Sequence, residues 1–272
     1  MQAGRWSPPS GTLGRLTTDA AVRAAASLPA LDRLMAQAEA MPPAVDLVAA
    51  LRGAQVRVIA EVKRASPSKG AIAQGLDAAA QAGRYAAGGA SAISVLTEPS
   101  AFGGALADLE GVARAVALPT IRKDFIVAPV QLWEARCAGA AGALLIVRAL
   151  APAELPRLID AAHVAGITPV VEIRTTEELR RARDAGAIII GVNNRDLETL
   201  VIDPATAEQL IPAIPSTCIA IAESGMTSVD DVARYARAGA DAVLVGSMVS
   251  SSSDPEAAVR SLTGVLRTAR VA

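Results

Sequence analysis

The segment CAGAAGALLIV, from Cys137 to Val147, joins a glycine- and alanine-rich turn to a continuous run of apolar residues. Such a turn is typical of a helix end, and the run that follows is typical of a strand buried on both faces. The same arrangement recurs in AAGGASAISVL (86–96), HVAGITPVVEI (163–173), DAGAIIIGV (184–192) and RAGADAVLVG (237–246). We interpret each segment as the junction between a helix and the next strand.

Strands and helices alternate along the chain, because alanine-rich stretches with leucine, arginine and glutamate at helical spacing separate the apolar runs. This alternation predicts a parallel sheet. Eight parallel strands, each followed by a helix, close a (β/α)8 TIM barrel, whereas a doubly wound sheet usually has fewer strands and a switch point. The predicted α/β barrel has strands at 56–62, 91–96, 120–123, 143–147, 168–173, 188–192, 218–222 and 242–245.

The length of 272 residues predicts a single domain, since a barrel of this kind fills about 250 residues. We expect the barrel to occupy residues 56–272, after an N-terminal helical extension at 1–55. Within the extension, SLPALDRLMAQAEA (27–40) and PAVDLVAALRG (43–53) are predicted helices.

The first residues, MQAGRWSPPSGTLGRL, contain Pro8, Pro9 and Gly11, which predict a disordered or loosely packed start, and they lack the apolar core of a signal peptide.

Composition excludes several function classes. The 26 basic and 27 acidic residues nearly cancel and aromatic residues make up 2%, which argues against nucleic-acid binding. The longest charge-free run, 209–222, is too short to span a bilayer and contains two prolines. His163 is the single histidine, and Cys137 and Cys218 lie far apart without CxxC spacing, so we expect neither a metal site nor a disulfide framework. A reduced cytoplasm fits best.

Charged and polar residues end the predicted strands, where barrel enzymes place their chemistry. Glu61 and Lys63 are two positions apart and therefore share a face. Buried ion pairs are seldom a net source of stability, so a functional site explains the cluster better than structural pairing does. The other strand-end residues are Lys123, Glu172, Asn193, Arg195, Glu223 and Ser224.

Lysine is rare in this chain, since 23 of the 26 basic residues are arginine. Lys63, Lys69 and Lys123 all lie at a strand end or in the loop that follows. An amine, unlike a guanidinium, can release a proton near neutral pH once its pKa is lowered from about 10.4. We therefore expect a lysine with a lowered pKa in the site.

Two glycine-serine elements follow the last two strands: Glu223-Ser224-Gly225 and Gly246-Ser247. Backbone N–H groups beside hydroxyls form anion-binding nests, and these two loops are the usual phosphate site of such barrels. Their joint position predicts a bound phosphate.

The motif IAEVKRASPSKG, from Ile59 to Gly70, resembles the first strand and loop of the indole-3-glycerol-phosphate synthase family, an enzyme family of tryptophan biosynthesis. The motifs SVLTEPSAFGG, IRKDFIV, ALLIV, VVEI, GVNNRDLETL, AESG and LVGS then follow in that family's order. Single elements such as AESG occur in other phosphate-binding barrels, whereas the ordered set is specific. The chain departs from the family after Gly246-Ser247, where Met248, Val249 and a serine run follow.

The resemblance implies catalytic roles. Lys123 would be the general acid that protonates the substrate's ketone oxygen during ring closure. Glu172 would handle the proton of the later dehydration, helped by Glu61, and Asn193 would orient nearby polar groups. Lys63, which also belongs to the implied catalytic set, would hold the anthranilate carboxylate together with Arg195.

The resemblance also implies how substrate binds. Glu223 would anchor the polar rim. An apolar wall for the anthranilate ring would come from Phe102, Phe125 and Leu197. The phosphate would lie against Ser66, Ser224, Gly225, Gly246 and Ser247.

The implied reaction is a decarboxylation by a carbon–carbon lyase. It converts 1-(2-carboxyphenylamino)-1-deoxyribulose 5-phosphate to indole-3-glycerol phosphate, CO2 and water by general acid/base catalysis, with no cofactor or metal. The partner is this small phosphorylated molecule, with neither nucleic acid nor membrane, and association with other tryptophan-pathway enzymes stays open. Two alternatives also stay open: another sugar-phosphate barrel enzyme, such as phosphoribosylanthranilate isomerase, or a noncatalytic phosphate-binding barrel subunit.

Overall fold

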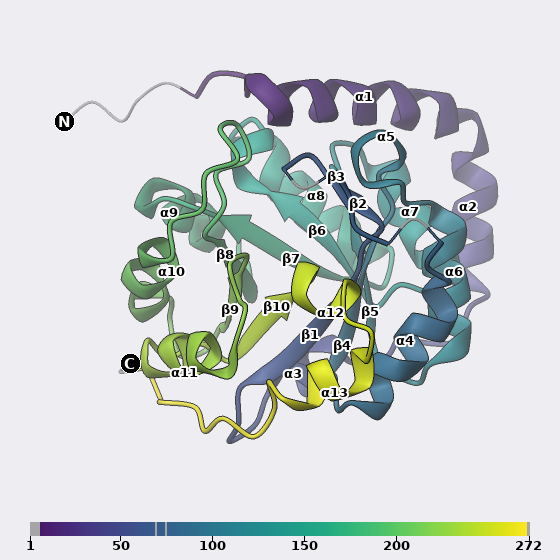
Figure 1. Ribbon diagram of the computed structural model, residues 1–272. Helices are drawn as coiled ribbons and strands as arrows, with labels where there is room; N and C mark the ends of the chain where they lie inside the picture. Colours follow the sequence, from purple (N-terminus) through teal and green to yellow (C-terminus); the bar gives the residue numbers. More distant parts are fainter. Residues whose placement is uncertain (1–5, 69, 74, 271–272) are drawn as a thin grey trace.

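The computed structural model describes residues 6–68, 70–73 and 75–270, in which eight parallel strands form a closed barrel. Figure 1 shows these strands at the centre of the molecule and the helices around them. The strand order around the barrel is β1-β10-β9-β8-β7-β6-β5-β4. Each predicted strand is present, with ends that differ by at most one residue: β1 (Arg57–Val62), β4 (Ala92–Leu96), β5 (Thr120–Lys123), β6 (Gly142–Ile146), β7 (Thr168–Ile173), β8 (Ile189–Asn193), β9 (Ile219–Glu223) and β10 (Ala242–Val245).

Helices follow the strands and pack against the outside of the barrel, as in a TIM barrel. Helix-ending glycines with φ of 86° at Gly139 and 94° at Gly239 confirm that the repeated segments are helix-to-strand junctions. A short hairpin, β2 (Ala65–Ser66) and β3 (Gly70–Ala71), follows β1. The helices after β1 are α4 (Ala78–Ala87), α5 (Pro99–Phe102), α6 (Leu106–Ala115), α7 (Pro129–Cys137), α8 (Glu154–Val164), α9 (Thr176–Asp184), α10 (Ala205–Leu210), α11 (Val229–Arg237), α12 (Ser247–Ser250) and α13 (Pro255–Arg260).

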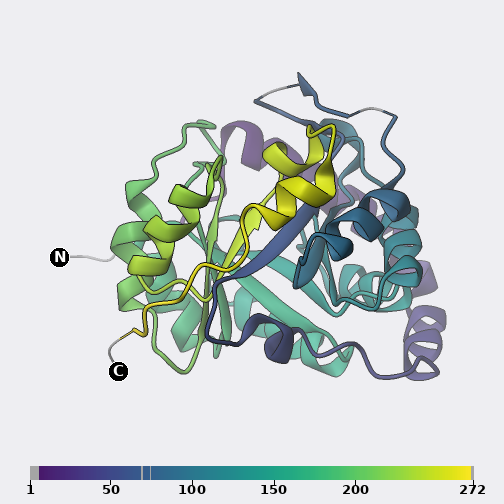
Figure 2. The ribbon, with the colours of Figure 1, turned by 60° about the horizontal axis from the view of Figure 1, so that its bottom comes forward.

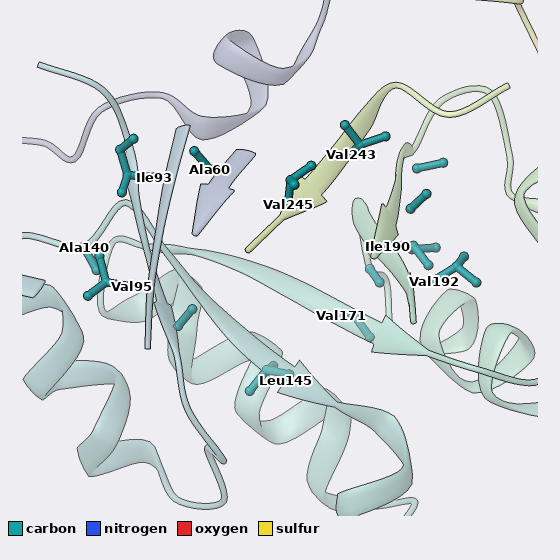
Figure 3. Packing of buried hydrophobic residues seen from close by; sticks show 14 of the residues in the cluster. Ala60, Ile93, Val95, Ala140, Leu145, Val171, Ile190, Val192, Val243 and Val245 are labelled. Atoms are coloured by element: carbon teal, nitrogen blue, oxygen red, sulfur yellow. The ribbon is translucent and has the colours of Figure 1, made fainter. Parts of the chain in front are cut away.

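Two apolar clusters result from the alternation of side chains along each strand. The outer cluster fills the layer between strands and helices, and Figure 3 shows part of it around Val95, Leu145 and Val171. The inner cluster fills the barrel with Ile59, Ile121, Leu144, Val170, Ile189, Ile221 and Leu244. Two residues after Val170 on the same face comes Glu172, so the alternation that fills the barrel with apolar groups also turns the carboxylate inward.

The N-terminal segment corrects one prediction. Of the first sixteen residues, expected to be disordered or loosely packed, residues 11–16 begin α1 (Gly11–Ser27), which runs along one side of the molecule in Figure 1. Pro8 and Pro9 precede the helix and do not interrupt it. Its Leu13 and Leu16 are buried in the inner cluster, which explains why the segment is ordered. Residues 1–5 lie outside the described part of the chain.

The two helices predicted in the extension are present in shorter form. One is α2 (Leu31–Glu39), which continues a 3-10 turn at Leu28–Ala30, and the other is α3 (Leu47–Leu51). Leu47 lies against Gly142, the first residue of β6, so α3 packs at the amino ends of the strands. Figure 2 shows α3 below the barrel, at the end away from the carboxyl ends of the strands. Among the described residues, no helix has the length and apolar character to cross a membrane.

Candidate active site

A cavity of about 410 Å³ lies at the carboxyl ends of the strands. It is lined by residues from the strand ends, from the loops after β1, β4, β5, β8, β9 and β10, and from α1. All fifteen predicted site residues line it: Lys123, Glu172, Glu61, Lys63, Asn193, Ser66, Phe102, Phe125, Arg195, Leu197, Glu223, Ser224, Gly225, Gly246 and Ser247. Lys69, the third lysine of the predicted site, lies outside the described residues.

Charged groups meet at the floor of the cavity in two ion-paired sets. Lys123 Nζ contacts Glu223 Oε2 and lies 3.3 Å from Glu172 Oε2. Lys63 Nζ lies 2.9 Å from Glu61 Oε1, as expected for residues two apart in extended chain at the end of β1. The three carboxylates are almost fully buried, so each depends on these cations for its charge to be tolerated.

The charge balance contradicts the expectation of a lysine with a lowered pKa. Burial alone would lower the pKa of Lys123, but Glu223, Glu172 and Glu61 outweigh burial and raise it. Lys123 is therefore a firmly held ammonium in the free protein. The proximity of three carboxylates from other strands is a tertiary property, which no local sequence pattern reveals.

The buried carboxyl groups differ in the direction of their pKa shifts. Burial raises the pKa of Glu223 to about 7, although Lys123 opposes this shift. For Glu61, burial would raise the pKa, but Lys63, Lys123 and Arg195 together lower it. The site thus holds a carboxyl group that exchanges its proton near neutral pH beside one that stays ionised, which is the separation that acid–base chemistry requires.

Two glycines leave room for these carboxylates. A Cβ atom at Gly191 of β8 would collide with the carboxylate of Glu223, and one at Gly246 would collide with Glu61 Oε1 and Lys63 Nζ. Any other residue would push charged groups out of place. These glycines are thus steric requirements of the site, and sequence reasoning had assigned Gly246 to phosphate binding and had missed Gly191.

Asn193 and Arg195 lie at the end of β8 and are held by hydrogen bonds. Asn193 Oδ1 accepts from the Arg195 backbone N–H at 2.9 Å and from Ser224 Oγ at 2.8 Å. The guanidinium of Arg195 donates to Leu200 O at 3.0 Å and to Ser68 Oγ at 3.1 Å. The Ser224 hydroxyl, predicted to face a phosphate, thus already donates to a protein group.

An apolar wall lies beside the charged floor. The ring centroids of Phe102 and Phe125 are 6.4 Å apart, and Leu197 completes the predicted set. Sequence reasoning missed further lining residues, of which Leu144 and Ile146 could have been found from their alternation along β6. Further apolar lining residues come from α1 and from loops, among them Leu13, Leu16, Leu200, Ile202 and Met226.

A second buried charge cluster behind the wall was also missed. Asp124 follows Lys123 directly and accepts hydrogen bonds from Thr97 Oγ1 at 2.8 Å and from the Phe125 N–H at 2.8 Å. Arg23 of α1 donates to Asp124 Oδ1 at 2.9 Å and lies 3.7 Å from Glu98 Oε1. Arg23 therefore connects α1 to both loops that carry the aromatic wall.

The opposite side of the cavity could hold an anion. Ser224 and Gly225 follow β9, and Gly246 and Ser247 lead from β10 into α12, so backbone N–H groups and hydroxyls meet in one place. Ser66 of the β2–β3 hairpin is buried against the same space. Among the described residues, no group of three or more His, Cys, Asp or Glu side chains is arranged to hold a metal ion.

The likeness to solved structures concerns the fold. A 3-hexulose-6-phosphate synthase from Salmonella typhimurium matches 76% of this chain and 96% of its own, with a TM-score of 0.61 and 17% identity. A thiamine phosphate pyrophosphorylase from Pyrococcus furiosus matches with a TM-score of 0.56 and 15% identity, over 76% of this chain and 93% of its own. At such identities the likeness concerns the barrel alone.

Sequence comparison is more specific. The chain is 55% identical to an indole-3-glycerol phosphate synthase from Streptomyces griseus, over 85% of this chain and 86% of the relative. It is 53% identical to one from Rhodococcus jostii, over 84% of both chains. The family model for indole-3-glycerol phosphate synthase matches residues 16–262. The chain therefore belongs to the indole-3-glycerol phosphate synthase family.

Proposed function

We propose that this protein is an indole-3-glycerol-phosphate synthase of tryptophan biosynthesis. It acts as a carbon–carbon lyase that closes, decarboxylates and dehydrates 1-(2-carboxyphenylamino)-1-deoxyribulose 5-phosphate. Membership of the family supports this activity. The observation that carries it is the Lys123 ammonium, held between the carboxylates of Glu172 and Glu223 on the floor of a cavity with an aromatic wall.

Lys123 is the general acid of ring closure. As the ring carbon attacks the ketone, negative charge develops on the ketone oxygen, and an alkoxide is a stronger base than an amine. The raised pKa of Lys123, which Glu223, Glu172 and Glu61 bring about against the effect of burial, keeps the proton on the amine until that charge forms. Glu223 holds the ammonium in place through their direct contact.

The later steps use the carboxylates. Ring closure leaves an iminium in the substrate, which accepts the electrons released on decarboxylation, so no cofactor is required. Glu172 removes the proton of the dehydration, and Glu61, which stays ionised beside Lys63, assists it. A positioned acid or base contributes about 10²- to 10⁴-fold to such a step.

The charged floor, the apolar wall and the opposite, anion-binding side of the cavity each bind a different part of the substrate. Lys63 and Arg195 hold the anthranilate carboxylate, and Phe102, Phe125 and Leu197 contact the ring. The phosphate lies against Ser66, Ser224, Gly225, Gly246 and Ser247. For Ser224 we assign this contact to the backbone, because its hydroxyl donates to Asn193.

The proposal also covers the cellular location and the domain organisation of the enzyme. We place it in the cytoplasm as a single domain, in which residues 1–55 are an extension of the barrel at 56–272. Burial of Leu13 and Leu16 among residues of the barrel interior supports the single domain.

The test is to mix the purified protein with the carboxyphenylamino-deoxyribulose phosphate, without added metal or cofactor, and to follow indole fluorescence. We expect turnover in the wild type and none in Lys123→Ala, which should still bind the substrate. Arg114→Ala is the control, because Arg114 is an exposed cation on α6 paired with Glu110.

Either of two results would contradict the proposal and favour another function. A folded wild type that binds the substrate without turning it over would indicate a noncatalytic barrel. Turnover of phosphoribosylanthranilate in a panel of sugar phosphates, and none of the expected substrate, would indicate an isomerase.

A further inference from the structure

Two consecutive asparagines end the β8 region and point to opposite sides of the barrel wall. Asn193 lines the cavity, whereas Asn194 is fully buried in the layer between the strands and the helices α10 and α11. This opposition follows from the pleat, which sends successive side chains to opposite faces. The family resemblance implies a role for Asn193, and the reaction proposed above gives none to Asn194.

Every hydrogen-bonding group of the Asn194 side chain has a partner. Its Nδ2 donates to Ser224 O at 3.0 Å and to the Tyr235 hydroxyl at 2.9 Å, and its Oδ1 accepts from the Ala207 N–H at 2.9 Å. Asn194 thus ties the start of α10 and the last turn of α11 to the loop after β9. Its contact with Ser224 is the one that reaches the cavity lining.

Ser224 has a backbone conformation that residues with a side chain rarely adopt. Its φ is 66°, in the left-handed region, and Gly225 follows with a φ of 87°. Such a residue persists only where its surroundings hold it. Asn194 holds the Ser224 carbonyl from outside the barrel, and Asn193 accepts from its hydroxyl on the inside.

The Ser224 hydroxyl in turn fixes the amide of Asn193. The Arg195 backbone N–H can only donate, so the Asn193 atom that it contacts must be the oxygen. The Ser224 hydroxyl donates to the same oxygen. Within the described residues, Nδ2 of Asn193 has no protein partner, and it is therefore left to donate to a bound molecule.

We propose that Asn194 is a positioning residue for the reaction. By holding Ser224 in the left-handed conformation, it fixes the Asn193 amide so that Nδ2 donates to an oxygen of the sugar-phosphate chain of the substrate. This inference rests on the proposed function, because it takes the substrate from it.

The test compares Asn194→Asp with Tyr235→Phe. The aspartate keeps an acceptor for the Ala207 N–H, but it replaces the donor to Ser224 with an oxygen that repels the carbonyl. Tyr235→Phe removes the other partner of the same Nδ2 and leaves the bond to Ser224 in place. We expect kcat/KM to fall by about tenfold or more in Asn194→Asp, as for other small misplacements of reacting groups, and to stay near wild type in Tyr235→Phe.

A double-mutant comparison separates positioning from stability. Ser224→Gly removes the hydroxyl that contacts Asn193 and adopts the left-handed conformation without help, so the loss of kcat/KM caused by Asn194→Asp should be smaller in a Ser224→Gly background than in the wild type. If the buried charge of Asn194→Asp prevents folding, Asn194→Ala removes the same donor without a charge and takes its place in both comparisons.

Two outcomes would overturn the inference: equal kcat/KM in the Asn194 and Tyr235 variants, or an undiminished cost of the Asn194 change in the Ser224→Gly background. Wild-type turnover in the same assay tests the proposed function separately. If the wild type binds the substrate without turnover, calorimetric substrate affinities of the same variants still decide the role of Asn194.

Discussion

Lys123 Nζ lies 3.3 Å from Glu172 Oε2, although β5 and β7 are separated by β6 in the barrel. The acid and the base of the proposed reaction therefore form an ion pair across the barrel before substrate binds. Because Lys123 is the acid and Glu172 the base, we expect a change of Lys123 to slow ring closure and a change of Glu172 to slow the dehydration.

Glu172→Gln should slow the reaction after ring closure, because an amide cannot remove the proton of the dehydration. CO2 leaves before the dehydration, so we expect its release to precede the formation of indole fluorescence in a single turnover. Glu154→Gln, on the exposed start of α8, is the matched control. Normal turnover in Glu172→Gln would contradict its role.

Glu223→Gln should change how stability depends on pH. Because burial raises the pKa of Glu223 to about 7, above the ordinary 4.5, the folded protein keeps a proton that the unfolded chain releases. The stabilisation from this proton is complete below pH 4.5 and is lost as pH rises through 7. Each unit of pKa difference corresponds to about 1.4 kcal/mol.

The measurement is the unfolding free energy of both proteins in denaturant at several pH values between 4.5 and 8. Between pH 4.5 and 7, the wild type should lose stability relative to Glu223→Gln, which carries no proton at this position. Parallel curves would show that the carboxyl group of Glu223 titrates normally.

Ser247→Ala should mainly raise KM. If the hydroxyl donates to the phosphate, its loss removes one hydrogen bond to a charged group, worth about 1.5 to 3 kcal/mol, or one to two orders of magnitude in KM. Ser261→Ala is the control, because that exposed hydroxyl donates to Ala258 O away from the cavity. An unchanged KM in Ser247→Ala would remove Ser247 from the phosphate site.

Arg23→Met should destabilise the protein more than Arg15→Met does. Both are cations of α1, but Arg23 faces the buried carboxylates of Asp124 and Glu98, whereas Arg15 pairs with the exposed Asp19. Because Arg23 is itself 32% exposed, we expect a loss of about 2 to 3 kcal/mol, below that of a fully buried pair. The exposed pair should contribute about 0.5 kcal/mol or less. Equal melting temperatures of the two variants would disprove the link between α1 and the aromatic wall.

The barrel and the polar residues at its strand ends could be predicted from the sequence for a common reason. Strands buried on both faces are long apolar runs, and a polar residue that ends such a run, such as Glu172 or Lys123, stands out and must lie at the mouth. These are local signals, and they extend to the glycine turns after β9 and β10.

Properties that depend on distant residues could not be predicted. The pKa of Lys123 rises because of carboxylates on other strands, and no pattern around position 123 indicates their distance. The order of α1 depends on Leu13 and Leu16 meeting the inner cluster, whereas the prolines before the helix suggested a loose start. The conformation of Ser224 likewise depends on Asn194, which lies thirty positions earlier in the chain and on a different strand end.

The placement of α1 has a consequence for the order of events during synthesis. This helix and Ser10, which precedes it, leave the ribosome well before their partners: Asp124 binds Arg23, and Glu198 binds the backbone and hydroxyl of Ser10. Leu13 and Leu16 therefore stay without their burial site until most of the barrel has been translated. The nascent chain carries a helix whose apolar face only the nearly complete barrel can cover, so the mouth of the active site is assembled last.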